Sequence, residues 1–264
     1  MIAIPDRYTG TLRAVRSVWD AERFVVIGAA AVACHTGLWW RGTIDLDLTV
    51  ASGIEAYAGD LETLGWRRVR GAPLRWTVPD GSQVDVVPSG KELLAQGELT
   101  WPDGDGRMDL TGFRLAHADA VSVDLAGGCD VRVASLGSLV VLKMAAYLDQ
   151  PWLRDSDLAD IAHIMHDYPP DDDEARWSDE IVELGMQFED VGPFLLGAQI
   201  GSLVDRKETQ MIERFLSSID DPDDRLATVH RMARRAPSGW RDPGLLLAGL
   251  TAFANGLRGA GGKR

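Results

Sequence analysis

The sequence predicts an α+β fold in which a core of mixed strands and helices is followed by a domain made of helices alone. Over residues 1–134, the apolar residues switch repeatedly between the two-residue period of strands and the longer period of helices. From Ser135 onward, every apolar segment has the helical period. We therefore expect one domain over residues 1–134 and a second, helical domain over residues 135–264.

The first half of the core predicts alternating helices and strands. Glycines mark several ends: Gly28 closes a buried strand, Gly37 closes a compact helix and Gly65 ends an amphipathic helix that Ser52 caps. The expected helices are 12–22, 29–37 and 53–65, and the expected strands are 23–28 and 43–50.

The second half of the core predicts a strand meander. Turn sequences at 71–73 ("GAP") and 79–82 ("PDGS") separate strands over 66–70, 74–78 and 83–89. Residues 112–134 add two or three strands. The expected helices of the second domain are 135–149, 154–167, 179–190, 205–219, 223–235 and 244–257.

Composition limits the class of protein. The chain has 264 residues, two distant cysteines and a formal net charge of −13. Neither an export signal nor an apolar run of membrane-spanning length is visible, so we expect a cytoplasmic protein without a membrane partner. An acidic chain is unlike a mainly electrostatic nucleic-acid binder. Residues 230–241 and 255–264 are locally basic, which fits either solvated helix ends or a contact with RNA or a triphosphate.

Two carboxylates stand among aliphatic residues in "RGTIDLDLTV" (41–50). In a strand, Asp45 and Asp47 share one face and repel each other unless a cation lies between them. Mg²⁺, which prefers oxygen ligands, would supply that cation. Asp85 in "QVDVVPS" is a candidate third carboxylate that binds metal and accepts a proton from an attacking hydroxyl. The alternative is an edge strand with a solvated face for the pair, and a solvent-facing side chain for Asp85.

Two further features fit phosphate chemistry. Gly28 lies at a strand-to-helix turn, where free backbone N–H groups at a helix start favour an anion. Lys143 is a solitary cation in the apolar stretch "LVVLKMAAYLD" and could place its charge on nucleotide phosphates. The alternatives are an ordinary turn, and a lysine whose stem covers apolar neighbours while its head reaches water.

Taken together, these residues resemble the nucleotidyltransferases with a DNA polymerase β-like fold, and more narrowly the AbiEii-type toxins of type IV toxin–antitoxin pairs. The resemblance covers about residues 24–166. Its ordered motifs are a glycine turn (Gly28), a helix with His35 and Gly37, the run Arg41-x-Thr43-x-Asp45-x-Asp47, a later helical lysine (Lys143), and an Asp-x-x-Asp segment that opens the next helix (Asp157, Asp160).

The resemblance implies an α/β nucleotidyltransferase core whose helical domain completes the nucleotide cleft. One or two Mg²⁺ ions would bind Asp45, Asp47 and Asp85. An NTP would contact Gly28, Ala29, Arg41, Thr43 and Lys143. Lys143, Asp157 and Asp160 would act with the three carboxylates in catalysis, and Lys143 would face Asp45 and Asp47.

The family implies an RNA acceptor, tRNA above all, and a cognate antitoxin as partner. The acidic charge favours instead a cationic small molecule such as an aminoglycoside. Ala29 stands where the superfamily usually has serine or glycine, so a phosphate-binding hydroxyl is missing. This departure leaves open a catalytically silent binding module.

Overall fold

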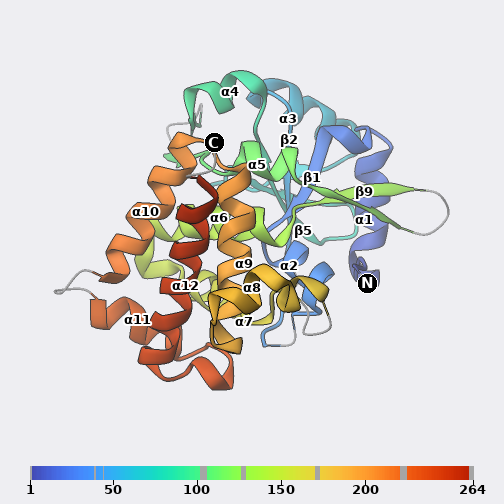
Figure 1. Ribbon diagram of the computed structural model, residues 1–264. Coiled ribbons are helices and arrows are strands. Elements are labelled where there is room, and N and C mark those ends of the chain that lie inside the picture. Colours follow the sequence, from blue (N-terminus) through green and yellow to red (C-terminus); the bar gives the residue numbers. More distant parts are fainter. Residues whose placement is uncertain are drawn as a thin grey trace. The chain divides into compact units, whose positions relative to one another are not determined.

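The computed structural model describes residues 2–38, 40–43, 45–101, 106–125, 129–169, 173–220 and 225–261. It divides into two compact units, Met1–Leu142 and Lys143–Arg264, whose elements are labelled in Figure 1. The predicted fold class, an α+β core followed by helices, is confirmed. The units divide within a helix, α6 (Leu136–Asp149), a few residues after the predicted domain boundary at 134/135.

The first unit is built on a mixed sheet. Among the described residues, seven strands follow the order β3-β4-β5-β2-β1-β9-β8. The strands are β1 (Phe24–Ile27), β2 (Leu46–Val50), β3 (Arg67–Arg68), β4 (Arg75–Thr77), β5 (Gln83–Pro88), β8 (Val121–Asp124) and β9 (Asp130–Val133). β2 pairs antiparallel with β1 and parallel with β5. It therefore lies inside the sheet, and the alternative of an edge strand at Asp47 is wrong.

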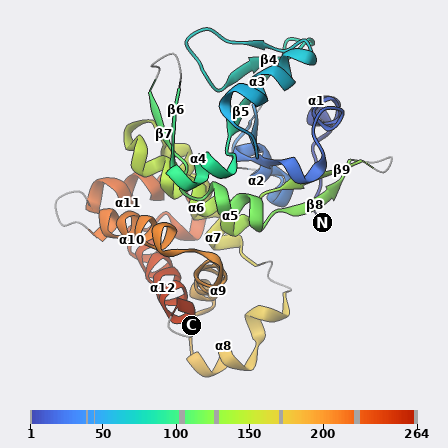
Figure 2. The same cartoon turned by 90° about the horizontal axis from the view of Figure 1, so that it is seen from above.

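Helices and a small second sheet surround these strands. The helices are α1 (Asp6–Arg16), η1 (Ala21–Arg23), α2 (Gly28–Thr36), α3 (Ile54–Thr63), α4 (Lys91–Gln96) and α5 (Phe113–Ala118). α2 packs against β1 and β2, and α5 packs against β1. Strands β6 (Glu98–Thr100) and β7 (Arg107–Asp109) pair with each other and lie beside α4 (Figure 2).

Several expected elements differ from the structure, among them the expected helix 179–190, which is broken between Leu184 and Phe188 because Gly185 ends its first part in a left-handed conformation. The first helix covers 6–16 rather than 12–22, because the chain turns into a helix directly after Pro5, with Asp6 in its first turn. Residues 112–134 begin with a helix, α5, because burial of Phe113 and Leu115 overrides the strand pattern. The residue before α3 is Gly53, and Ser52 does not cap it.

Some predictions fall partly outside the described residues. These are Ile44 of the expected strand 43–50, residues 126–128 of the expected strand region, the first two residues of the expected helix 223–235, and residues 262–264 of the basic segment 255–264.

The second unit is helical, as predicted. Beyond α6 it contains η2 (Pro151–Leu153), α7 (Asp155–Asp167), η3 (Glu174–Trp177), α8 (Asp179–Leu184), α9 (Phe188–Leu203), α10 (Arg206–Asp220), α11 (Arg225–Ala233), η4 (Ser238–Trp240) and α12 (Pro243–Gly261). α9 and α12 lie side by side (Figures 1 and 2). A Cβ at Gly197 would lie 2.1 Å from the Phe253 carbonyl oxygen, so glycine allows this close approach. Among the described helices, none is long and apolar enough to cross a membrane.

Candidate active site

The strand register brings two of the predicted carboxylates together. Asp47 of β2 pairs with Asp85 of β5, and Asp85 pairs in turn with Arg75 of β4. Residues directly opposite each other on neighbouring strands point to the same face of a sheet. Arg75, Asp85 and Asp47 therefore form a charged row across three adjacent strands.

The opposite face of the same strands is apolar. Leu46, Leu48, Val84 and Val86 are all buried, whereas Asp47 and Asp85 are only partly buried. This is the two-residue alternation that the sequence predicts for half-buried strands. The carboxylates thus occupy the polar face of an interior pair of strands.

Gly28 lies directly against the Asp47 carboxylate. Its φ is +65°, in the left-handed region that favours glycine. A Cβ at this position would lie 2.1 Å from Oδ2 of Asp47, far inside van der Waals contact. The glycine is therefore needed both for the turn from β1 into α2 and for the position of the carboxylate, and Ala29 follows as the second residue of α2.

Asp45 lies just before β2 rather than within it. The predicted strand 43–50 is therefore wrong at its N-terminal end: the strand begins at Leu46, and Asp45 lies outside it. The Tyr8 hydroxyl of α1 donates to the backbone carbonyl oxygens of Asp45, at 3.2 Å, and Thr43, at 3.4 Å. Helix α1 thus holds the segment that leads into the carboxylate strand.

Arg75 is the residue that sequence reasoning missed. Its Nε donates to Oδ1 of Asp85 at 2.8 Å and its Nη2 donates to Oδ2 at 2.8 Å. This hydrogen bonding outweighs partial burial and, with the charges of Asp85, Asp45 and Asp47, raises the pKa of Arg75 further above its usual value. The guanidinium therefore lies in the field of all three predicted carboxylates.

The donor set suits a hard divalent cation. Asp47 and Asp85 offer carboxylate oxygens from adjacent positions, and Gly28 keeps the space beside Oδ2 of Asp47 free of a side chain. Asp47 and Asp85 are the residues that would hold Mg²⁺, with Asp45 from the preceding segment. As the described residues stand, however, no three His, Cys, Asp or Glu side chains are grouped closely enough to hold a metal ion.

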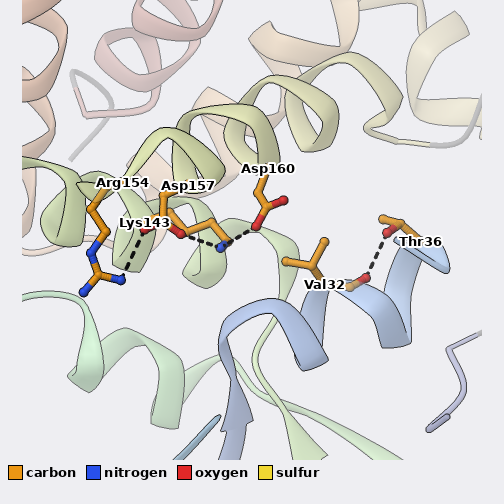
Figure 3. Close-up of polar contacts among 6 residues, drawn as sticks. All are labelled: Val32, Thr36, Lys143, Arg154, Asp157 and Asp160. Atoms are coloured by element: carbon orange, nitrogen blue, oxygen red, sulfur yellow. Dashed lines mark hydrogen bonds and ion pairs between the residues drawn. The ribbon is translucent and has the colours of Figure 1, made fainter. Parts of the chain in front are cut away.

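The second unit joins the other three predicted catalytic residues in one ion cluster (Figure 3). Lys143 Nζ lies 2.9 Å from Oδ1 of Asp157 and 2.7 Å from Oδ2 of Asp160, and Arg154 lies 3.6 Å from Oδ2 of Asp157. Burial alone would lower the pKa of Lys143, but the charges and hydrogen bonds of the two aspartates raise it. The cluster pins α6 to α7, and Lys143 is buried rather than exposed to water.

Arg41 and Thr43 lie apart from the glycine turn. They line a cavity of about 450 Å³ together with Arg7, Ala33, Gly37, Leu38 and Gly42. Gly37 follows the last turn of α2, whereas Gly28 begins that helix. The predicted nucleotide contacts of the first unit are thus distributed along the length of α2, and contact with an NTP stays a prediction. So does the expectation that Lys143 faces Asp45 and Asp47.

His35 has a structural position. Its Nε2 lies 2.8 Å from the Ala134 carbonyl oxygen. Burial lowers the pKa of His35 despite this hydrogen bond, so the ring is neutral near pH 7. The hydrogen bond joins α2 to the residue that follows β9, so packing explains the place of His35 in the motif.

Comparisons with known proteins give distant structural likenesses, among them the two that follow. No protein-family model matches the chain, and no curated protein matches it. A crystal structure of an antigenic nucleotidyltransferase-like protein from Paracoccidioides brasiliensis has 14% identity, covers 86% of this chain and 94% of its own, and gives a TM-score of 0.43. A solution structure of the antibiotic-resistance factor ANT(2'')-Ia has 16% identity, covers 82% and 95%, and gives a TM-score of 0.37. Both are too distant to bear on what this chain binds.

Proposed function

We propose that the protein is a Mg²⁺-dependent nucleotidyltransferase that moves a nucleoside monophosphate from an NTP to an acceptor hydroxyl. The observation that carries the proposal is the register of Asp47 with Asp85 on parallel strands, with Gly28 packed against the Asp47 carboxylate. Nucleotidyl transfer needs carboxylates that bind the metal ion close to a turn that can bind the phosphates of the NTP. Gly28 and Asp47 also belong to the motifs that resemble the nucleotidyltransferases.

Each residue has a role that follows from its position. Asp47 and Asp85, with Asp45, would hold the cation, which supplies charge neutralisation at the phosphate under attack. Asp85 would accept the proton of the acceptor hydroxyl. The backbone N–H groups at the start of α2, from Gly28 and Ala29, would bind phosphate oxygens without the hydroxyl that a serine would add. Because these groups are fixed in place, catalysis would come mainly from positioning and electrostatics.

For the acceptor we propose RNA, with tRNA as the substrate that the resemblance implies. A toxin of this kind would act with a cognate antitoxin as partner. The RNA would contact the locally basic segments near the end of the chain, since phosphate neutralisation supplies most of the affinity of such contacts.

A cationic small molecule is the second candidate acceptor, and the ion pairs of the second unit favour it. Arg231 of the first basic segment is paired with Asp155, and Arg258 of the second is paired with Glu213 at 2.8 Å. Each pair removes one positive charge from the surface that RNA would use. With a net charge of −13, the chain would attract a polycation such as an aminoglycoside more readily than a polyanion.

One transfer assay tests both the reaction and the acceptor. The purified chain is incubated with Mg²⁺ and each of the four α-labelled NTPs, with either total tRNA or an aminoglycoside panel. Label transferred to one acceptor class identifies it. Asp47→Asn should abolish transfer while the fold survives, whereas Asp124→Asn, an exposed aspartate on strand β8, should leave transfer unchanged.

The assay also separates an enzyme from a silent module. If no NTP with Mg²⁺ raises the melting temperature and no acceptor is labelled, the chain is a binding module. If Asp47→Asn transfers label at the wild-type rate, the carboxylate row is not the active site.

A further inference from the structure

Arg75 and Asp85 form a two-pronged ion pair on the polar face of the sheet. Two N–H groups of one guanidinium meet both oxygens of one carboxylate, at 2.8 Å each. The two residues are direct partners across β4 and β5, so the register of the hairpin fixes the pair. Two-pronged contacts of this kind are among the stronger charge-assisted hydrogen bonds.

The charges on this face of the sheet suggest that Arg75 also compensates the neighbouring carboxylates. Asp85 lies beside Asp47, and the charges of Asp45 and Asp47 also act on Arg75. Three carboxylates near one another repel unless cations compensate them. Arg75 supplies positive charge at the same place where the proposed function requires a divalent ion.

We propose that Arg75 occupies the Asp85 carboxylate in place of the divalent cation, so that the guanidinium and the metal ion compete for it. This inference rests on the proposed function, because the metal site is part of that proposal. Each Asp85 oxygen keeps a second lone pair, but a divalent ion there would lie close to the guanidinium, and like charges repel. The divalent ion therefore binds Asp85 only when the ion pair between Arg75 and Asp85 is broken.

The exposure of the pair makes such an exchange feasible. The Arg75 side chain is 35% exposed and the Asp85 side chain 21%. A partly exposed ion pair has a small net free energy, because water solvates the released charge.

Manganese binding to the full-length protein tests the competition without any reaction. Mn²⁺ affinity is measured by isothermal titration calorimetry in the wild type, Arg75→Gln, Arg75→Lys and Arg67→Gln. Arg67 lies on the neighbouring strand β3, is exposed and does not pair with Asp85, so its variant controls for the loss of one positive charge. Arg75→Gln should bind Mn²⁺ about tenfold more tightly, which corresponds to about 1.4 kcal/mol. Arg75→Lys should be intermediate, and Arg67→Gln should match the wild type.

The melting temperature gives an independent readout. Without metal, Arg75→Gln removes the ion pair of Asp85 and should melt below the wild type. Mn²⁺ should raise the melting temperature of Arg75→Gln by more than it raises that of the wild type. Adding Asp47→Asn to Arg75→Gln should remove the tight Mn²⁺ binding. This loss would show that the ion binds at the row of Asp47 and Asp85.

The outcomes separate this inference from the proposed function. If the wild type binds Mn²⁺ and transfers nucleotide, but Arg75→Gln binds Mn²⁺ no more tightly, the competition is refuted and the proposed function stands. If none of the variants binds Mn²⁺, or if Asp47→Asn leaves the binding intact, the metal site and the competition both fail. If Arg75→Gln binds more tightly but no acceptor is labelled, only the proposed reaction fails. Should Arg75→Gln not fold, unchanged Mn²⁺ affinity in Arg75→Lys refutes the competition.

Discussion

Replacing Gly28 by alanine should damage the carboxylate site far more than replacing another left-handed glycine of the same helix. Gly28 (φ +65°) and Gly37 (φ +73°) lie at the two ends of α2. An added Cβ at Gly37 has no atom within 4 Å, whereas at Gly28 it would lie 2.1 Å from Oδ2 and 2.7 Å from Cγ of Asp47. Comparing Gly28→Ala with Gly37→Ala therefore separates the cost of a left-handed backbone from the steric clash with the Asp47 carboxylate.

The two variants should differ in the free energy of unfolding. A non-glycine residue in the left-handed region costs about 1 kcal/mol, and this is the loss expected for Gly37→Ala. Gly28→Ala adds an overpacked contact, which costs about 1–3 kcal/mol. We therefore expect Gly28→Ala to lose about 2–4 kcal/mol in total and to push the Asp47 carboxylate out of register with Asp85.

Urea denaturation measures the stabilities, and Mn²⁺ calorimetry measures the site. Gly28→Ala should weaken Mn²⁺ binding by at least about tenfold, the factor given by 1.4 kcal/mol, whereas Gly37→Ala should bind like the wild type. Equal unfolding free energies and equal Mn²⁺ affinities in the two variants would refute the reasoning, because the Asp47 contact would then have no effect.

Three further predictions concern buried groups. Lys143→Met should lose about 3–5 kcal/mol of stability in urea, because it removes the lysine charge from two buried aspartates, whereas Lys207→Met at an exposed position should change stability by less than about 0.5 kcal/mol. Burial raises the pKa of the Cys34 thiol to about 12, so in a Cys129→Ser variant, which removes the other free thiol, Ellman's reagent should modify Cys34 only after unfolding; rapid reaction of the native variant would contradict the burial of Cys34. Burial, together with the Arg132 charge, lowers the pKa of His117 from 6.5 to about 4. The unfolded chain thus takes up a proton below pH 6.5 that the folded protein does not, and the free energy of unfolding should fall by up to about 3 kcal/mol as the pH drops from 6.5 to 4. His117→Gln should flatten this slope, and an unchanged slope would assign the pH dependence to another group.

Local patterns in the sequence were enough to predict most elements of the sheet region. The glycines at 28 and 37 mark the start and end of α2, and the turns at 71–73 and 79–82 separate β3, β4 and β5. The errors arose where a local pattern competes with burial. The segment 113–118 reads as strand, yet it forms α5 because Phe113, Leu115 and Ala116 pack into the core.

The candidate site could be predicted in part. The alternation in 46–50 and 83–88 predicts that Asp47 and Asp85 each face away from the apolar side. Their being side by side depends on β2 and β5 pairing in parallel, which is a long-range choice that local periodicity does not encode. Arg75 was within reach of the sequence: the turn that pairs Thr77 with Gln83 necessarily pairs Arg75 with Asp85. The donation from Tyr8 to the Asp45 carbonyl joins segments 37 residues apart and has no local signal.

The ion pairs of Lys143 and of Arg75 show why exposure, more than charge, decides what such a contact can do. Lys143 and Asp160 have side chains that are 6% and 0% exposed, so separating them would leave charges in a medium that solvates them poorly. That cluster is fixed, and it holds two helices together. Arg75 and Asp85 have the same kinds of charge on a sheet face that water reaches, so the guanidinium can be released at a small cost in free energy. Lys143 and Asp160 in the interior therefore hold the fold together, whereas the exposure of Arg75 and Asp85 is what the proposed exchange with a metal ion requires.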